Sequence, residues 1–132
     1  MQELEFAKKR SVIGFDIDEE RIKELNSGLD RNFEFSKEEL KNSKKIKLTF
    51  IEDELRGANC YIVTAPTPID KLKKPNLKPL LMASKIVGNF LSNKDLVIYE
   101  STVYPGCVEE ECVPILEKSS GLKFNQDFFC GY

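Results

Sequence analysis

Three apolar segments of this 132-residue chain are each followed directly by polar groups that could hold a nucleotide. These segments are residues 11–15, 60–63 and 96–99. Asp16 follows the first, Thr64-Ala65-Pro66-Thr67 follows the second, and Glu100-Ser101-Thr102 follows the third. Carboxylates, hydroxyls and backbone amides at the carboxyl ends of buried parallel strands are the groups with which open α/β sheets bind ligands. The pattern therefore predicts a nucleotide-binding edge.

Each of these polar groups also has a simpler interpretation. Asp18 or a neighbour is expected to cap the helix predicted at 19–25, so Asp16 could be such a cap. Ser101 and Thr102 could cap the helix that starts near Gly106. Arg21, one turn into the first of these helices, could be an ordinary surface charge. For any one site the structural role is favoured, but three such sites at three strand ends favour a binding edge.

The elements that would position these groups alternate along the chain. Apolar runs predict strands at 11–16, 60–64, 96–99 and 128–132, and alternation predicts a strand at 46–50. Periodic segments predict helices at 3–9, 19–25, 37–42, 52–56, 80–91 and 107–118, with Pro114 kinking or breaking the last. In the helix at 80–91 we expect Leu80, Met82 or Ala83, Val87 and Phe90 on the buried side. This alternation predicts an α/β domain over 1–132, a parallel sheet with helices on both faces.

Composition limits the classes of partner. The net charge is −2, from 20 basic and 22 acidic residues, which argues against a general nucleic-acid or membrane-surface binder. Lysines cluster at 37–47 and 71–78, and solvated loops and helix faces explain them better than phosphate steering. No apolar run has the length of a membrane span and no signal peptide opens the sequence, so we expect a cytoplasmic protein.

The four cysteines predict neither a metal site nor a disulfide. They form no CxxC pair and the chain contains no histidine, which argues against zinc. Cys60 and Cys130 lie in apolar runs and are predicted to be small core residues. Cys107 and Cys112 are five residues apart and are not expected to share a helix face.

Asp16-Ile17-Asp18 permits a competing hypothesis. An apolar strand that ends in two aspartates resembles the nucleophile loop of haloacid-dehalogenase-type phosphohydrolases, which use magnesium. That family expects threonine or valine, and often glycine, after the second aspartate, where this chain has Glu19-Glu20. A later acidic pair for magnesium is also not found. A phospho-receiver domain fits less well still, because no aspartate and lysine lie at suitable strand ends.

Three segments together resemble one family. They are VIGFDIDEERIKELNSG, YIVTAPTPID, and VIYESTVYPGCVEEECVPILE with GLKFNQDFFCGY. The sequence is similar to the NAD-binding domain of the UDP-glucose/GDP-mannose dehydrogenase family, over nearly its whole length. These enzymes oxidise the C6 alcohol of a nucleotide sugar to a carboxylate with NAD. The segments ESTVYPG and CVPILE are most similar to the branch of the family that acts on UDP-N-acetylhexosamines for polysaccharide synthesis.

The resemblance implies a role for each strand-end residue. Asp16 would bind the adenosine ribose and disfavour a 2′-phosphate, and Arg21 would lie beside the adenosine phosphate region. Thr102 would be the one catalytic residue, helping to position a water molecule. The remaining residues implied to bind the cofactor are Val63, Thr64, Ala65, Pro66, Thr67, Ser101 and Val103, with Thr102 also among them. Of these, Thr67 is the best-supported contact, and residues 101–103 would lie near the nicotinamide.

The departures from the family pattern are equally informative. The family opens with a strand and a GxGxxG loop, whereas residues 1–9 resemble only the second half of the helix that follows that loop. We therefore expect an incomplete Rossmann-type sheet that lacks its first strand. The two strands that would flank the missing one are expected either to pair with each other or to associate with a second copy of the chain, as a homodimer, through their exposed edges. The family's nucleophilic cysteine and UDP-sugar domain are not matched, so we expect this polypeptide alone to be inactive. A UDP-glucose 6-dehydrogenase fragment and a non-catalytic remnant or binding module remain alternatives.

Overall fold

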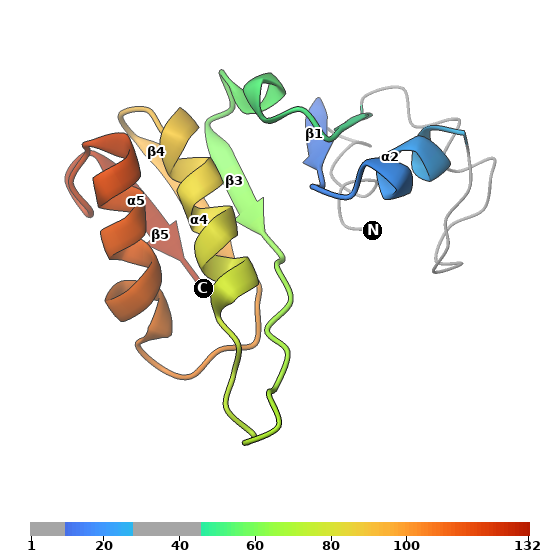
Figure 1. Cartoon of the computed structure of the whole chain (residues 1–132). Coiled ribbons are helices and arrows are strands. Elements are labelled where there is room, and N and C mark those ends of the chain that lie inside the picture. Colours follow the sequence, from blue (N-terminus) through green and yellow to red (C-terminus); the bar gives the residue numbers. More distant parts are fainter. Residues whose placement is uncertain (1–9, 28–45) are drawn as a thin grey trace. The chain divides into compact units, whose positions relative to one another are not determined.

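The computed structural model describes residues 10–27 and 46–132, and the chain forms two compact units, 1–56 and 57–132 (Figure 1). Each unit has its own parallel sheet. The helices predicted at 3–9 and 37–42 lie outside the described residues. The described elements confirm the predicted α/β class, and every pairing between strands is parallel.

The first unit is a strand–helix–strand segment. Strand β1 (Val12–Phe15) leads into helix α2 (Glu19–Asn26), and β2 (Ile46–Thr49) pairs with β1 from Val12↔Ile46 to Phe15↔Thr49. A 3₁₀ turn, η1 (Glu52–Leu55), follows β2. Both strands lie close to their predicted positions at 11–16 and 46–50.

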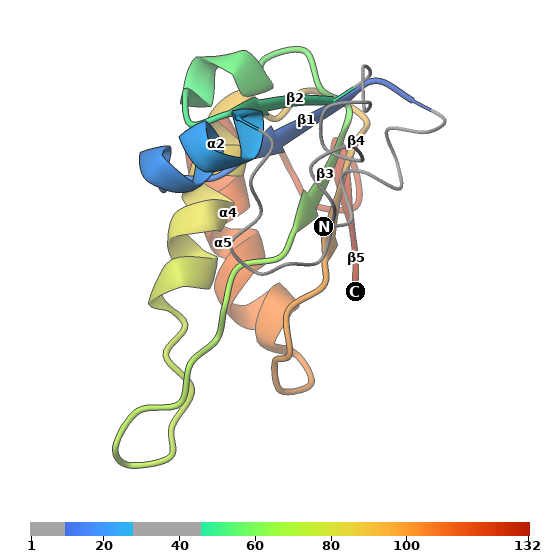
Figure 2. The same cartoon turned by 90° about the vertical axis from the view of Figure 1, so that its right-hand side faces the viewer.

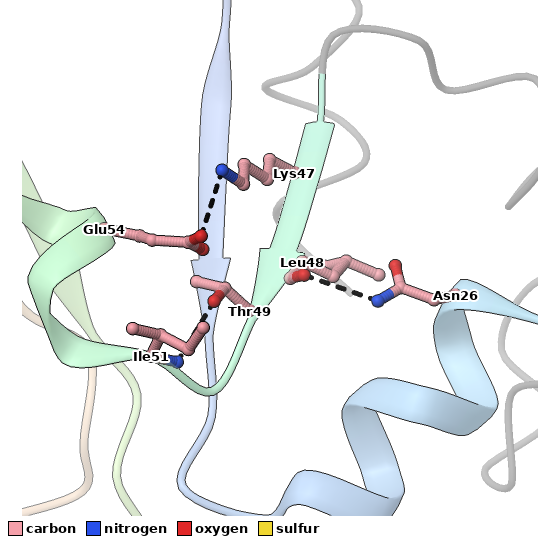
Figure 3. A network of polar contacts seen from close by, with 6 residues as sticks. All are labelled: Asn26, Lys47, Leu48, Thr49, Ile51 and Glu54. Carbon is pink, nitrogen blue, oxygen red and sulfur yellow. Dashed lines mark hydrogen bonds and ion pairs between the residues drawn. The ribbon is translucent and has the colours of Figure 1, made fainter.

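Helix α2 begins and packs as its sequence predicts. The Asp18 carboxylate accepts a hydrogen bond from the Arg21 amide at 3.1 Å, which identifies Asp18 as the N-cap. Ile22 and Leu25, three residues apart on one helix face, are buried. The Asn26 side chain at the helix end donates to the Leu48 carbonyl at 3.4 Å and so fastens the helix to β2 (Figure 3).

Side chains of β2 hold the η1 turn in place. The buried Thr49 hydroxyl accepts a hydrogen bond from the Ile51 amide at 3.0 Å, and Lys47 pairs with Glu54 at 3.1 Å (Figure 3). Hydrogen bonding to Thr49, then to Lys47, lowers the pKa of Glu54 below its usual value. The turn is therefore fixed by contacts within its own unit.

The second unit contains a three-stranded sheet in the order β3-β4-β5. Its strands are β3 (Cys60–Val63), β4 (Asp95–Tyr99) and β5 (Phe128–Gly131). Helix α4 (Lys78–Phe90) connects the first two strands, and a π-helical turn, η2 (Val108–Cys112), with helix α5 (Val113–Ser120), connects the last two. Both helices cover one face of this sheet in Figures 1 and 2.

Helices α4 and α5 pack side by side at short distance (Figure 1). Gly88 of α4 makes this possible, because a Cβ atom built there would lie 2.6 Å from Ser119 Cβ. The core beneath the helices is apolar and includes the fully buried Leu80, Val97, Leu116 and Phe128. One buried hydrogen bond crosses it, between Ser84 Oγ and the Tyr99 hydroxyl at 2.7 Å.

The predicted break at Pro114 is confirmed. Pro114 lies in the first turn of α5, where the missing N–H of proline costs nothing, and the π-helical turn precedes it. Cys107 and Cys112, which their spacing predicts not to share a helix face, are both fully buried. A π-helical turn closes i→i+5 bonds, so residues five apart can face the same side.

Two predictions of burial fail in the second unit. Met82 is 52% exposed, and the buried positions of α4 include Ser84 and Gly88, although Leu80 and Val87 are buried as expected. Cys60 is exposed rather than a core residue, and Cys130 is only partly buried. Cys60 begins β3, a strand that pairs with β4 alone among the described residues.

Candidate functional site

The carboxyl ends of β3 and β4 lie side by side, and the loops that follow the two strands leave the sheet in the same direction (Figure 1). Val63 and Tyr99 are register partners at the last position of the two strands, and the Glu100 amide donates to the Val63 carbonyl at 2.9 Å. The predicted polar segments 64–67 and 100–103 therefore begin at the same level of the sheet. The parallel register brings these predicted residues together.

Two hydrogen bonds join the loops beyond the last backbone pair. The Ser101 hydroxyl donates to the Ala65 carbonyl at 2.7 Å, and the Thr67 hydroxyl donates to the Thr102 carbonyl at 2.8 Å. Each loop thus provides one side-chain donor and one backbone acceptor. The sequence predicted that these residues share an edge, but no local pattern predicts these pairings.

Two further hydroxyls at this edge remain available. Thr64 and Thr102 are exposed, and within residues 10–27 and 46–132 no hydrogen bond of either hydroxyl is found. A threonine hydroxyl can both donate and accept, so these two groups suit ribose hydroxyls, an amide or a water molecule. They are the side chains through which this edge can meet a polar ligand.

Proline and glycine shape the two loops. Pro66 and Pro68 cannot donate backbone hydrogen bonds, and the Pro68 carbonyl accepts from the Asn76 amide at 2.7 Å, which closes the base of an exposed hairpin. In the second loop Gly106 has φ of +85°, a conformation that glycine adopts without strain. The Gly106 carbonyl then accepts from the Glu110 amide at 2.9 Å, so the helix begins here.

In the first unit, Asp16 lies at the end of β1 and is not the helix cap. Its amide donates to the Thr49 carbonyl at 3.2 Å, and its Oδ1 accepts from the Asp18 amide at 2.9 Å. Because Asp18 provides the cap, the exposed Asp16 carboxylate is held at the strand end by the backbone. A fixed carboxylate at this place has the acceptors that a ribose diol needs. Arg21, one helical turn further on, is partly buried.

Three of the four cysteines of the second unit, Cys107, Cys112 and Cys130, are poor nucleophiles. Burial raises the pKa of the Cys107 and Cys112 thiols, and it raises the pKa of Cys130 to about 12. A thiol attacks as its thiolate, which these three form only at high pH. The described residues contain no group of three or more side chains suited to a metal ion. No helix in the described ranges is long and apolar enough to cross a membrane.

Parallel strands joined by helices, with polar residues at their carboxyl ends, define an α/β nucleotide-binding domain of the Rossmann type. The chain belongs to the UDP-glucose/GDP-mannose dehydrogenase family: residues 3–131 match that family's NAD binding domain. This membership confirms the predicted resemblance and replaces the phosphohydrolase hypothesis for the Asp16-Ile17-Asp18 segment.

Known relatives agree with this assignment. The chain is 54% identical over 129 residues to the UDP-N-acetyl-D-glucosamine 6-dehydrogenase of Pseudomonas aeruginosa and 52% identical to that of Salmonella typhi. These matches cover 98% of this chain but only 31% and 30% of the relatives, so the chain spans about a third of their length. A UDP-D-ManNAc dehydrogenase structure from Pyrococcus horikoshii matches with a TM-score of 0.90 and 33% identity, over 98% of this chain and 32% of that one.

Proposed function

We propose that this chain is the NAD-binding part of a UDP-N-acetylhexosamine 6-dehydrogenase. The observation that carries the proposal is the hydroxyl-lined edge at the ends of β3 and β4, where Thr64 and Thr102 are exposed and two hydrogen bonds fix the loops. The 52–54% identity to two enzymes that are named UDP-N-acetyl-D-glucosamine 6-dehydrogenases supports the sugar class.

When bound, NAD would accept a hydride from the sugar. The residues of this chain would bind and orient it. The Asp16 carboxylate would accept hydrogen bonds from the adenosine ribose hydroxyls, and its negative charge would repel the 2′-phosphate of NADP. The Arg21 guanidinium would lie near the adenosine phosphate, as a cation that pairs well with phosphate oxygens.

The second unit would contribute residues of its own to cofactor binding. Residues 63–67 would line the diphosphate and ribose, and residues 101–103 would lie near the nicotinamide. The Thr102 hydroxyl, exposed and able to donate or accept, would help to position the water that enters the product. Oxidation of a primary alcohol to a carboxylate removes four electrons, so the whole reaction consumes two NAD.

We expect the 132-residue polypeptide to lack this activity by itself. The reaction needs a nucleophile that captures the aldehyde intermediate, and the three thiols with raised pKa do not provide one. The exposed Cys60 begins β3 and so lies at the opposite end of that strand from the loop edge. A polypeptide of this sequence that reduces NAD with UDP-N-acetylglucosamine would contradict this expectation. Two alternatives compete with this proposal. The chain could be part of a UDP-glucose 6-dehydrogenase, or it could be a non-catalytic remnant, which would not bind NAD.

Calorimetric titration of the purified chain with NAD tests the proposal. We expect saturable binding that Asp16→Ala weakens at least tenfold, because the variant loses a charge-assisted pair of ribose hydrogen bonds. Asp53→Ala is the matched control, since Asp53 is an exposed aspartate of the same unit and its partner is Arg56. NADP should bind more weakly than NAD. No binding to the wild-type chain at millimolar NAD would overturn the proposal.

A further inference from the structure

The two hydrogen bonds between the loops form a reciprocal arrangement. Thr67 reaches from the first loop to a carbonyl of the second, and Ser101 reaches from the second loop to a carbonyl of the first. The partners are 35 and 36 residues apart in sequence. We call these two hydroxyls, of Thr67 and Ser101, the loop clamp.

The loop clamp extends the β3–β4 pairing where the backbone can no longer do so. The last backbone hydrogen bond between the two segments runs from the Glu100 amide to the Val63 carbonyl. Beyond it the first loop contains Pro66 and Pro68, which have no N–H to donate. Side-chain donors therefore hold the loops together at the positions where proline interrupts the ladder.

The acceptors of the loop clamp explain what it fixes. Thr67 binds the carbonyl of Thr102 and not its hydroxyl, so the backbone of Thr102 is held while its side chain stays exposed. Ser101 in the same way fixes the Ala65 carbonyl, next to Thr64, whose side chain is also exposed. One pair of hydroxyls at this edge is engaged within the protein and the other pair faces outward.

We infer that Thr67 and Ser101 are positioning residues, which hold Thr64 and Thr102 in place for the cofactor. This inference rests on the NAD-binding function proposed above. The loop clamp acts before the ligand arrives, and it reduces the conformational freedom that binding would otherwise remove. Its contribution to affinity is therefore exerted through the outward-facing threonines.

Substitutions that remove one clamp hydroxyl test the inference. We expect Thr67→Val and Ser101→Ala each to weaken NAD binding about 2- to 10-fold, the range that one net hydrogen bond provides. Thr67→Ser keeps the hydroxyl and should restore affinity to near the wild-type value. The measurement is the dissociation constant for NAD by calorimetry, with the melting temperature of each variant recorded alongside.

Ser120→Ala is the matched control for a merely structural effect. The Ser120 hydroxyl also donates to a backbone carbonyl, that of Leu116 at 2.6 Å, but it lies at the end of α5. This variant should lower the melting temperature without changing the NAD dissociation constant. An equal loss of affinity in Ser120→Ala would mean that the clamp variants act through general stability, and the inference would be wrong.

Coupling to Thr102 separates positioning from any other role. If the loop clamp acts through Thr102, then Thr102→Val should weaken NAD binding strongly in the wild type but little in the Thr67→Val, Ser101→Ala background. Additive losses would contradict the inference, as would unchanged affinity in both clamp variants while the wild type binds. Failure of the wild type itself to bind NAD would instead overturn the proposed function.

Discussion

At the scale of single residues, hydrogen bonds within the protein decide which polar side chains can still bind a ligand. Two aspartates follow β1: Asp18 caps helix α2, whereas Asp16 lies at the strand end and accepts a hydrogen bond from the Asp18 amide. Four hydroxyls follow β3 and β4, and the loop clamp engages two of them. The sequence predicts the full set of polar residues, because side-chain type and strand position are local properties. For the hydroxyls, which of them are engaged depends on partners 35 and 36 residues away, and no local pattern predicts it.

The buried polar pair between α4 and β4 shows the same limit. Helical periodicity predicts an apolar residue, Met82 or Ala83, on the buried face of α4, whereas Ser84 is fully buried. The Ser84 hydroxyl donates to the Leu80 carbonyl at 3.0 Å, so the Tyr99 hydroxyl serves as donor in the 2.7 Å bond between them. A serine is stable in this position only because a tyrosine from a distant strand satisfies it.

The cysteines provide a residue-scale prediction about reactivity. In the native protein at neutral pH only Cys60, which is exposed, should be alkylated rapidly by iodoacetamide. Burial raises the pKa of Cys107, Cys112 and Cys130, so their reactive thiolate population is small at neutral pH and grows only at alkaline pH. Intact-mass spectrometry should show one adduct under native conditions and four in denaturant.

Cys60→Ala is the control for this assignment. The variant should acquire no rapid adduct under native conditions and three in denaturant. Rapid native alkylation of the variant would mean that one of the other thiols is accessible and ionised. That result would also reopen the question of a nucleophile within this polypeptide.

At the scale of elements, the sequence predicts where helices begin and break better than it predicts how they pack against each other. Asp18 and Pro114 predict a cap and a break because each acts through its own backbone or through the adjacent turn. The close approach of α4 and α5 is not predicted, although Gly88 lies within a helical pattern. Glycine in a helix is unfavourable by itself, so its presence gains meaning only from the neighbouring helix.

Gly88→Ala therefore provides an element-scale prediction. The new methyl group would lie 2.6 Å from Ser119 Cβ, closer than two carbon atoms can pack, so the helices must separate. We expect a net loss of about 1–3 kcal/mol in the free energy of unfolding, from overpacking that outweighs the better helix propensity of alanine. Urea denaturation followed by circular dichroism measures it.

Ser119→Gly combined with Gly88→Ala is the matched rescue. The second substitution removes the atom with which the new methyl group collides, so the double variant should be more stable than the sum of the two single losses predicts. A Gly88→Ala variant at least as stable as the wild type would show that the helices separate at no cost. Strict additivity of the two substitutions would show that the contact is not the cause.

At the scale of the whole molecule, the chain corresponds to one domain of the relatives that it matches. It spans about a third of its named relatives, and its described strands form two sheets of two and three strands. Among the described residues, β1 pairs with β2 in the first unit, and β3 pairs with β4 in the second.

Among the described residues β3 pairs with β4 alone, which predicts association of the chain along the other edge of β3. Unpaired N–H and C=O groups along a strand attract another strand, and β3 carries none of the lysine or proline residues that commonly block such pairing. We expect light scattering after size exclusion to show a molar mass that rises with concentration above the 15.1 kDa of one chain. The physical cause is hydrogen bonding along the edge, so a charge placed there should oppose it.

Cys60→Lys introduces that charge at the exposed first position of β3 and should shift the equilibrium toward the single chain. Met82→Lys is the matched control, because Met82 is 52% exposed on α4, so this variant adds the same charge away from a strand. If both variants dissociate the chain equally, net charge and not the edge is responsible. A wild-type chain that stays at the mass of one copy at every concentration would exclude edge pairing. The backbone N–H and C=O groups that drive this pairing are present without any ligand, so the absence of a ligand could not explain that result.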